Sequence, residues 1–160
     1  MPATERRRVR PYHTRRYHLR GDPPIPVAVL DEVDYAELDT ERATQLFAAS
    51  FSNLGLDLAR IGEVSVVLVS PETIRDLNLR FRDRDEPTDV LSFEVDGPYG
   101  EMVGEVVICP VCADTERGVD ELVVHGALHL GGMDHGEDFG ASEMARVQRA
   151  VMEELRGEEC

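Results

Sequence analysis

The chain has 160 residues, of which 42% are hydrophobic, and its formal net charge is −15. This length and apolar content are typical of one globular domain with a hydrophobic core. So acidic a chain lacks the basic face of a general nucleic-acid-binding protein, and it contains no run of about 18 apolar residues that could span a membrane. Three cysteines, an odd number, fit a reducing compartment rather than a disulfide framework. We therefore expect a cytoplasmic protein.

Charge is distributed unevenly along the chain. Residues 1–22 carry seven arginines against two acidic residues, a net of +5, whereas the remainder carries ten arginines against thirty acidic residues, a net of −20. The basic segment ends in Asp22-Pro23-Pro24, which is typical of a disordered arm that could contact nucleic acid. A solvated extension explains it equally well. We predict an arm over residues 1–24 and one domain over residues 25–160.

The first part of the domain predicts a strand and a helix. Residues 25–30 form a short apolar run that is typical of a strand. Asp39 or Thr40 is placed to cap a helix that ends before Gly55. The residues that share its inner face are Ala43, Leu46, Phe47, Ser50, Phe51 and Leu54.

A second strand and helix follow, and then two strands and a final helix. Residues 64–69 have a buried-strand pattern, and Ser70-Pro71-Glu72 combines a cap, an early proline and an early acid. Residues 90–95 and 103–108 predict two more strands. The inner side of the second helix comprises Ile74, Leu77, Asn78 and Phe81. The apolar face of the last helix comprises Met144, Val147, Val151, Met152 and Leu155.

Three histidines within eleven residues point to specific chemistry. His125 and His129 are four residues apart, so on a helix both imidazoles can reach one metal ion. Gly131 and Gly132 are suited to ending that helix, and His135 can approach from the loop that follows. Three neutral imidazoles leave a fourth coordination position open, as in catalytic zinc sites. The sequence therefore predicts one zinc ion per chain, bound by these three histidines.

The same spacing occurs in the metzincin protease signature HExxHxxGxxH. Gly126 stands where that signature has glutamate, so the base that activates water in these peptidases is missing. Proteolysis is therefore a poor interpretation of the spacing.

A second motif, CxxC at Cys109 and Cys112, could be half of a structural zinc site or a redox pair. We favour neither, because a zinc site needs two further ligands and Cys109 ends a predicted buried strand.

The segment LNLRFRDRDEPTDVLSFE, residues 77–94, joins the second helix to the third strand and intersperses arginines with aspartates. A solvated turn, in which Pro87-Thr88-Asp89 starts the strand, explains this composition. The functional alternative is an arginine directed at a phosphate group, because the planar guanidinium can bind two oxygens.

With both segments considered, the chain resembles the YbeY family of zinc-dependent endoribonucleases, the rRNA maturation factors of bacteria. HGALHLGGMDH is similar to the family's HGxLHLxGYDH, and LNLRFRDRDEPTDVLSF is similar to its LNxxYRxxDxPTDVLSF. Gly104-Glu105-Val106 is similar to the family's Gly-Asp-Ile. The resemblance covers nearly everything after residue 25. In two respects the chain departs from it: Gly131 and Met133 replace a leucine and a tyrosine, and the connection from Cys109 to His125 is shorter.

The resemblance implies a single α+β domain, with a central mixed sheet of about four strands flanked by helices and the metal site on a helix and turn. It implies a metal bound by His125, His129 and His135, with His125 and Arg82 as catalytic residues. It also implies cleavage of single-stranded RNA, maturation of the 3′ end of small-subunit (16S) rRNA, and ribosome quality control. The expected partners are an rRNA precursor and the small ribosomal subunit, with neither DNA nor a membrane.

The mechanistic hypothesis is that zinc polarises a phosphoryl oxygen or supplies hydroxide, while Arg82 stabilises negative charge on phosphorus. Asp134, Glu137 or Asp138 could orient a ligand imidazole.

Two alternative functions remain open. One is a metal-dependent hydrolase of a peptide or small amide. The other is a non-catalytic ribosome-assembly factor with structural zinc, which a fourth protein ligand such as a cysteine would favour.

Overall fold

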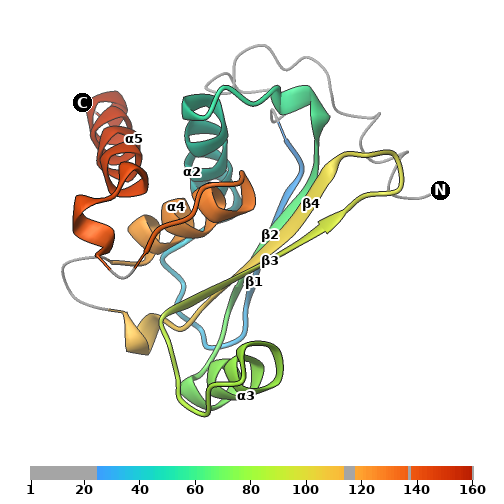
Figure 1. Cartoon of the computed structure of the whole chain (residues 1–160), viewed down its shortest axis with the longest axis vertical. Coiled ribbons are helices and arrows are strands. Elements are labelled where there is room, and N and C mark those ends of the chain that lie inside the picture. The colour runs from blue at the N-terminus through green and yellow to red at the C-terminus, as the bar shows by residue number, and fades with distance from the viewer. Residues whose placement is uncertain (1–24, 114–117, 137, 160) are drawn as a thin grey trace.

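The computed structural model describes residues 25–113, 118–136 and 138–159 (Figure 1). The predicted arm, residues 1–24, lies outside the described residues. The helices and strands are β1 (Val27–Asp31), α2 (Thr40–Asn53), β2 (Ile61–Leu68), α3 (Pro71–Arg82), β3 (Val90–Asp96), β4 (Met102–Ile108), α4 (Gly118–Leu130) and α5 (Glu143–Glu159). Three short 3-10 helices are η1 (Leu58–Arg60), η2 (Pro110–Cys112) and η3 (Phe139–Ala141).

The four strands form one mixed sheet in the order β1-β2-β4-β3. β1, β2 and β4 are parallel, and β3 pairs antiparallel with β4, which follows it in the chain to form a hairpin. Burial alternates along β2, as expected for a strand whose two faces differ in cover. The predicted α+β fold with a mixed sheet of about four strands is confirmed.

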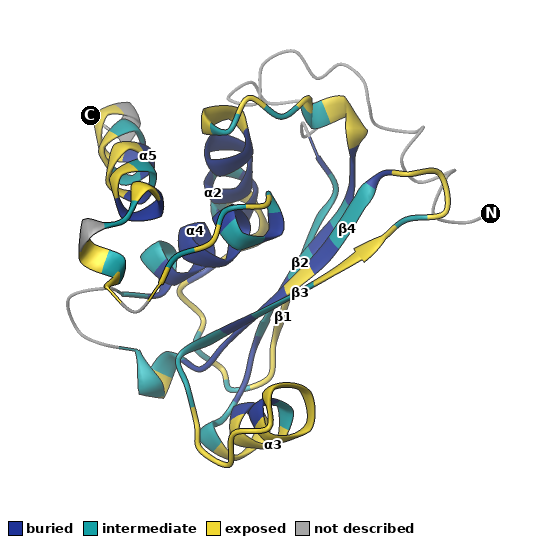
Figure 2. Ribbon diagram, viewed as in Figure 1, coloured by how far each residue is buried: buried dark blue, intermediate teal, exposed yellow. Residues whose placement is uncertain are grey.

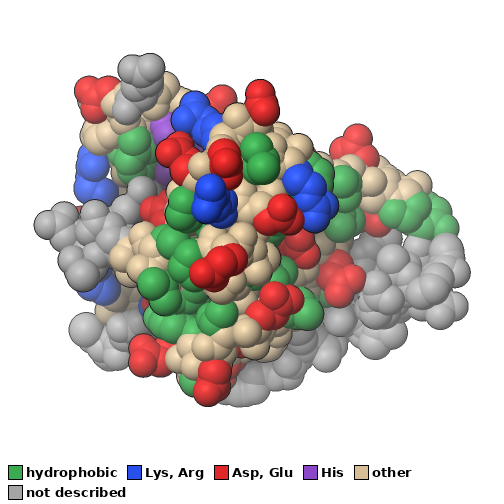
Figure 3. Space-filling model, turned by 90° about the horizontal axis from the view of Figure 1, so that it is seen from below, with side chains coloured by type: hydrophobic (Ala, Val, Ile, Leu, Met, Phe, Trp, Pro, Cys, Tyr) green, Lys and Arg blue, Asp and Glu red, His purple; other side chains and the backbone are tan. Residues whose placement is uncertain are grey.

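Helices cover the two faces of the sheet unequally. Figure 1 shows α2, α4 and α5 together on one side of the sheet, and α3 on the other side near one end. The larger hydrophobic core lies between the sheet and the three grouped helices, and a smaller core lies under α3 around Ile74, Leu91 and Val107. The face on the α3 side carries interspersed acidic, basic and apolar side chains (Figure 3). None of the described helices is long and apolar enough to cross a membrane.

α4 is the central helix of the grouped three, and it is buried along almost its whole length (Figure 2). A helix that is apolar on all sides is typical of such a position. Gly126 allows its close approach to the sheet, because a Cβ built there would lie 2.5 Å from Cγ1 of Val106 in β4. The sequence of α4 thus fixes where the histidines lie relative to the sheet.

The sequence predicted the N-terminal caps of α2 and α3 correctly. Asp39 is the N-cap of α2 and accepts from the backbone nitrogen of Arg42, and Ser70 caps α3 by accepting from the backbone nitrogen of Thr73. The prediction that Phe81 faces inward was wrong: its side chain is 59% exposed and contacts the ring of Phe93 at a centroid distance of 5.3 Å. The last turn of α3 extends past the small core, so helical periodicity alone could not show where burial ends.

Candidate active site

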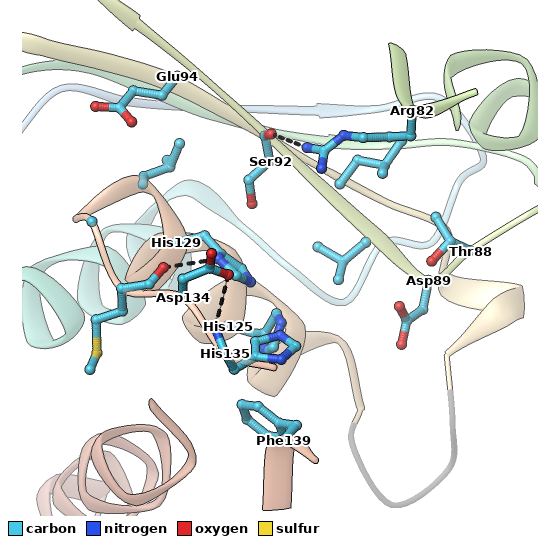
Figure 4. Close-up of a pocket in the computed structure, with 15 residues that line it drawn as sticks. Arg82, Thr88, Asp89, Ser92, Glu94, His125, His129, Asp134, His135 and Phe139 are labelled. Atoms are coloured by element: carbon cyan, nitrogen blue, oxygen red, sulfur yellow. Dashed lines mark hydrogen bonds between the residues drawn. The ribbon is translucent and has the colours of Figure 1, made fainter. Parts of the chain in front are cut away.

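The three predicted histidines converge at one end of α4 (Figure 4). His125 and His129 project from the helix and His135 from the loop that follows, and their ligand atoms all lie within 4.8 Å of one another. Two imidazole nitrogens on one tetrahedral zinc ion are roughly 3.4 Å apart, given a Zn–N distance of about 2.0–2.1 Å. The cluster therefore needs only a small side-chain movement to hold a metal ion.

The turn that delivers His135 is well hydrogen-bonded. Met133 donates from its backbone nitrogen to the carbonyl of Leu128, and Gly132 donates to the carbonyl of His129. These two bonds define a Schellman motif, with Gly132 at φ +106° in the conformation that favours glycine. A Cβ at Gly131 would collide with Leu54 at the end of α2, so that glycine permits close packing. The double glycine is thus accommodated by the fold.

Each histidine makes a further contact through its Nδ1 atom. Nδ1 of His129 lies 3.1 Å from the carbonyl oxygen of Met133, and Nδ1 of His135 lies 2.7 Å from that of Gly136. A carbonyl only accepts, so both Nδ1 atoms carry hydrogen in the neutral rings and both Nε2 atoms keep a lone pair for a metal. Nδ1 of His125 lies 3.0 Å from Oε1 of Gln148 in α5.

Asp134 is one of the three acidic residues predicted as candidates to orient a ligand imidazole, and its carboxylate has a partner in the backbone of the turn. Its carboxylate accepts from the backbone nitrogen of His135 at 2.8 Å and so stabilises the turn rather than a ring. Asp138 is exposed, and Glu137 lies outside the described residues. Gln148 was missed from the sequence, although a polar residue among apolar positions of the last helix could have signalled it.

The environment of His129 favours the neutral, metal-binding form. Burial lowers the pKa of His129, and the nearby His135 and Arg82 lower it further, while the Met133 carbonyl and Asp134 act in the opposite direction. Because metal binds only the deprotonated ring nitrogen, a lowered pKa reduces competition from protons near neutral pH.

Arg82 lines the same cavity, and it lies across strand β3 from the three histidines (Figure 4). It is the last residue of α3, and its guanidinium donates to the carbonyl oxygen of Ser92 in β3 at 3.0 Å. The neighbouring arginines differ, because Arg80 pairs with Asp76 and Arg84 with Glu86. A carbonyl carries no formal charge, so the guanidinium of Arg82 keeps its positive charge for an anionic ligand.

The cavity that joins Arg82 to the histidines has a volume of about 610 Å³. Its wall includes Asp89, which directly precedes β3, Ser92 and Glu94 from β3, and Phe139 from η3. Phe139 contacts the rings of His125 and His135 at centroid distances of 5.0 and 4.9 Å. The two sequence motifs, residues 77–94 and 125–135, thus line one site.

Cys109 and Cys112 are not part of the histidine cluster in the described chain. They pack in the small core beneath α3, where Cys109 is fully buried. Burial, together with a hydrogen bond from the Cys112 thiol to Cys109, raises the pKa of Cys112 to about 12. A thiol with such a pKa stays protonated at neutral pH and is a poor metal ligand or nucleophile.

Comparison with known proteins gives a family match that spans both motifs. The model of the family described as "Endoribonuclease YbeY" matches residues 29–156. A protein from Rubrobacter xylanophilus named Endoribonuclease YbeY is 66% identical over 135 residues, which covers 84% of this chain and 98% of the relative. One of the same name from Thermotoga maritima is 39% identical over 105 residues, covering 59% of this chain and 69% of the relative.

A solved structure is similar in fold. The solution structure of TM1509 from Thermotoga maritima matches with a TM-score of 0.53 and 30% sequence identity, covering 82% of this chain and 90% of that protein. The fold, the matched range and the identity to the Rubrobacter relative agree. The chain belongs to the YbeY family of endoribonucleases.

Proposed function

We propose that the protein is a zinc-dependent endoribonuclease that cleaves single-stranded RNA in the cytoplasm, and that it matures the 3′ end of 16S rRNA on the small ribosomal subunit as part of ribosome quality control. The observation that carries the proposal is the presence of Arg82 and the three histidines in one cavity. The family supports RNA as the substrate.

The residues of the cavity have complementary tasks in this reaction. His125, His129 and His135 would hold the zinc ion, which would act as a Lewis acid on a phosphodiester oxygen. Arg82 would bind the same phosphate and stabilise the negative charge that builds on it, because its planar fork matches two phosphate oxygens. Its bond to the Ser92 carbonyl fixes the side chain before substrate arrives.

Acidic side chains in the wall of the cavity oppose the binding of a phosphate group. Asp89 and Glu94 line the same space and repel a polyanion at close range. Binding of the scissile phosphate therefore depends on the positive charge of Arg82 and of the metal. Removal of the metal should abolish phosphate binding in the cavity as well as cleavage.

The two alternative functions have less support. A peptidase base has no place at Gly126, because a side chain there would meet Val106 at 2.5 Å and Ser92 Oγ at 3.1 Å. A closed structural zinc site would need a fourth protein ligand, and neither cysteine joins the cluster in the described chain.

A cleavage assay with matched substrates tests the proposal. Purified protein would be incubated with single-stranded RNA, double-stranded RNA, single-stranded DNA and casein, before and after chelation and after zinc is restored. We expect cleavage of single-stranded RNA alone, loss on chelation and recovery with zinc. Casein hydrolysis without RNA cleavage would overturn the assignment, and RNA cleavage that survives full removal of metal would overturn the zinc dependence.

A further inference from the structure

Gln148 is a buried polar residue on the inner face of α5, only 2% exposed. Its amide bridges two groups on α4. Oε1 lies 3.0 Å from Nδ1 of His125, and Nε2 donates to Oε2 of Glu121 at 2.9 Å. Glu121 and His125 are one helical turn apart, so the amide of α5 spans that turn. A buried amide that loses its hydrogen-bond partners destabilises the folded protein. These two bonds therefore favour one relative position of α4 and α5.

The bridge fixes the chemistry of His125. A carboxylate at Glu121 can only accept, so the amide nitrogen of Gln148 must face it and the amide oxygen must face the imidazole. An amide oxygen also only accepts, so Nδ1 of His125 carries the hydrogen. The neutral ring then keeps its lone pair on Nε2, the same nitrogen that His129 and His135 leave free.

His125 differs from the other two histidines in what holds it. Carbonyls of the adjacent turn orient His129 and His135, so the fold of that turn suffices for both. The orientation of His125 depends instead on a side chain from a helix that follows the site in the sequence. Polarisation of the amide by Glu121 also increases the negative charge on Oε1, which makes the imidazole a stronger electron donor.

We propose that Gln148 is a positioning residue of the metal site and that Glu121 holds it in the required orientation. This inference rests on the proposed metal site, and it assigns to α5 a direct role in preparing that site. Partners of this kind typically change metal affinity about 10- to 100-fold when they are removed.

The test uses metal-free protein and nitrogen-15 NMR of the histidine rings at about pH 8, which reports the tautomer without any substrate. Wild type should show His125 with hydrogen on Nδ1. In Gln148→Leu that preference should be lost, and zinc affinity, measured by competition with a chelating dye, should fall about 10- to 100-fold. The exchanged pair Glu121→Gln with Gln148→Glu should restore both, because a carboxylate then accepts from Nδ1 and from the new amide.

One control variant separates this role from a merely structural one. Glu154→Gln removes a charge from α5 and weakens a bond to Asn53, so it should leave the tautomer and zinc affinity unchanged. If Gln148→Leu fails to fold, the exchanged pair still decides, since it keeps the volume and the hydrogen bonds. Hydrogen on Nε2 in wild type, or wild-type zinc affinity in a folded Gln148→Leu, would overturn the inference. Neither readout uses RNA, so failure of the nuclease assignment would be recognised separately.

Discussion

The environment of a residue at the site changes its pKa, and His129 is the clearest example. Burial lowers its pKa below the ordinary value of 6.5, so the folded protein disfavours the charged ring. Well above pH 6.5 the ring is neutral in both the folded and the unfolded chain, and the shift has no effect on stability. As the pH falls below 6.5, the unfolded chain takes up a proton more readily than the folded one, and stability decreases.

We therefore expect the metal-free protein to lose stability between pH 6.5 and the lowered pKa of His129. Chemical denaturation of metal-free protein at a series of pH values would measure this. His129→Gln should flatten the dependence in that window. A wild-type unfolding free energy that rises as the pH drops through the window would contradict the assigned direction of the shift.

Gly126 is a second residue whose identity the packing requires. In Gly126→Ala the new Cβ would lie 2.5 Å from Val106 Cγ1, and we expect a destabilisation of about 1–3 kcal/mol from overpacking. Gly157→Ala in α5 is the matched control, because a Cβ there meets nothing within 4 Å. Denaturant unfolding would compare the two. Equal stability of Gly126→Ala and wild type would show that α4 can move away from β4.

The elements were predictable from sequence where local chemistry decides them. Both caps and the existence and order of the strands and helices followed from spacing and end signals, and the convergence of the histidines followed from helical geometry. Strand ends were less predictable: β2 starts at Ile61 rather than residue 64, because a pairing irregularity between Ile61 and Val64 extends the ladder. The exposure of Phe81 and the partners of Gln148 depend on how the helices pack. The pattern of the last helix could single out Gln148 as a polar residue among apolar positions, but it could not show that Gln148 bonds to His125 and Glu121.

The histidines of α4 and of the turn after it lead to a prediction about the zinc content of the protein. We expect about one zinc per chain in purified protein, and single alanine changes at His125, His129 or His135 should reduce that content strongly. Cys112→Ala is the control and should keep full zinc, since the cysteines pack elsewhere. Elemental analysis of the purified variants would measure it. Zinc that is retained in all three histidine variants and lost in the cysteine variant would support a structural site instead.

At the scale of the whole molecule, charge separates the predicted arm from the domain. We propose that residues 1–24 form a basic arm and that residues 25–160 fold independently of it, because the arm has no apolar periodicity to bury. Deleting residues 1–22 should leave the melting temperature and zinc content near those of the full chain, and should weaken RNA binding most at low salt. A large fall in the melting temperature after the deletion would contradict independent folding.

The joining of two distant motifs in one cavity is the central claim about the molecule, and Arg82 tests it most directly. Arg82→Ala should reduce cleavage of single-stranded RNA by roughly a hundredfold or more, while zinc content and melting temperature stay near wild type. Arg82→Lys should recover only part of the activity, because it keeps the charge and loses the fork. Arg80→Ala, which removes an equal charge from the same helix, should cleave at close to the wild-type rate. The decisive measurement is the cleavage rate of Arg82→Ala beside Arg80→Ala at matched low salt: a selective loss in the first is predicted, and equal rates in the two would contradict the assigned site.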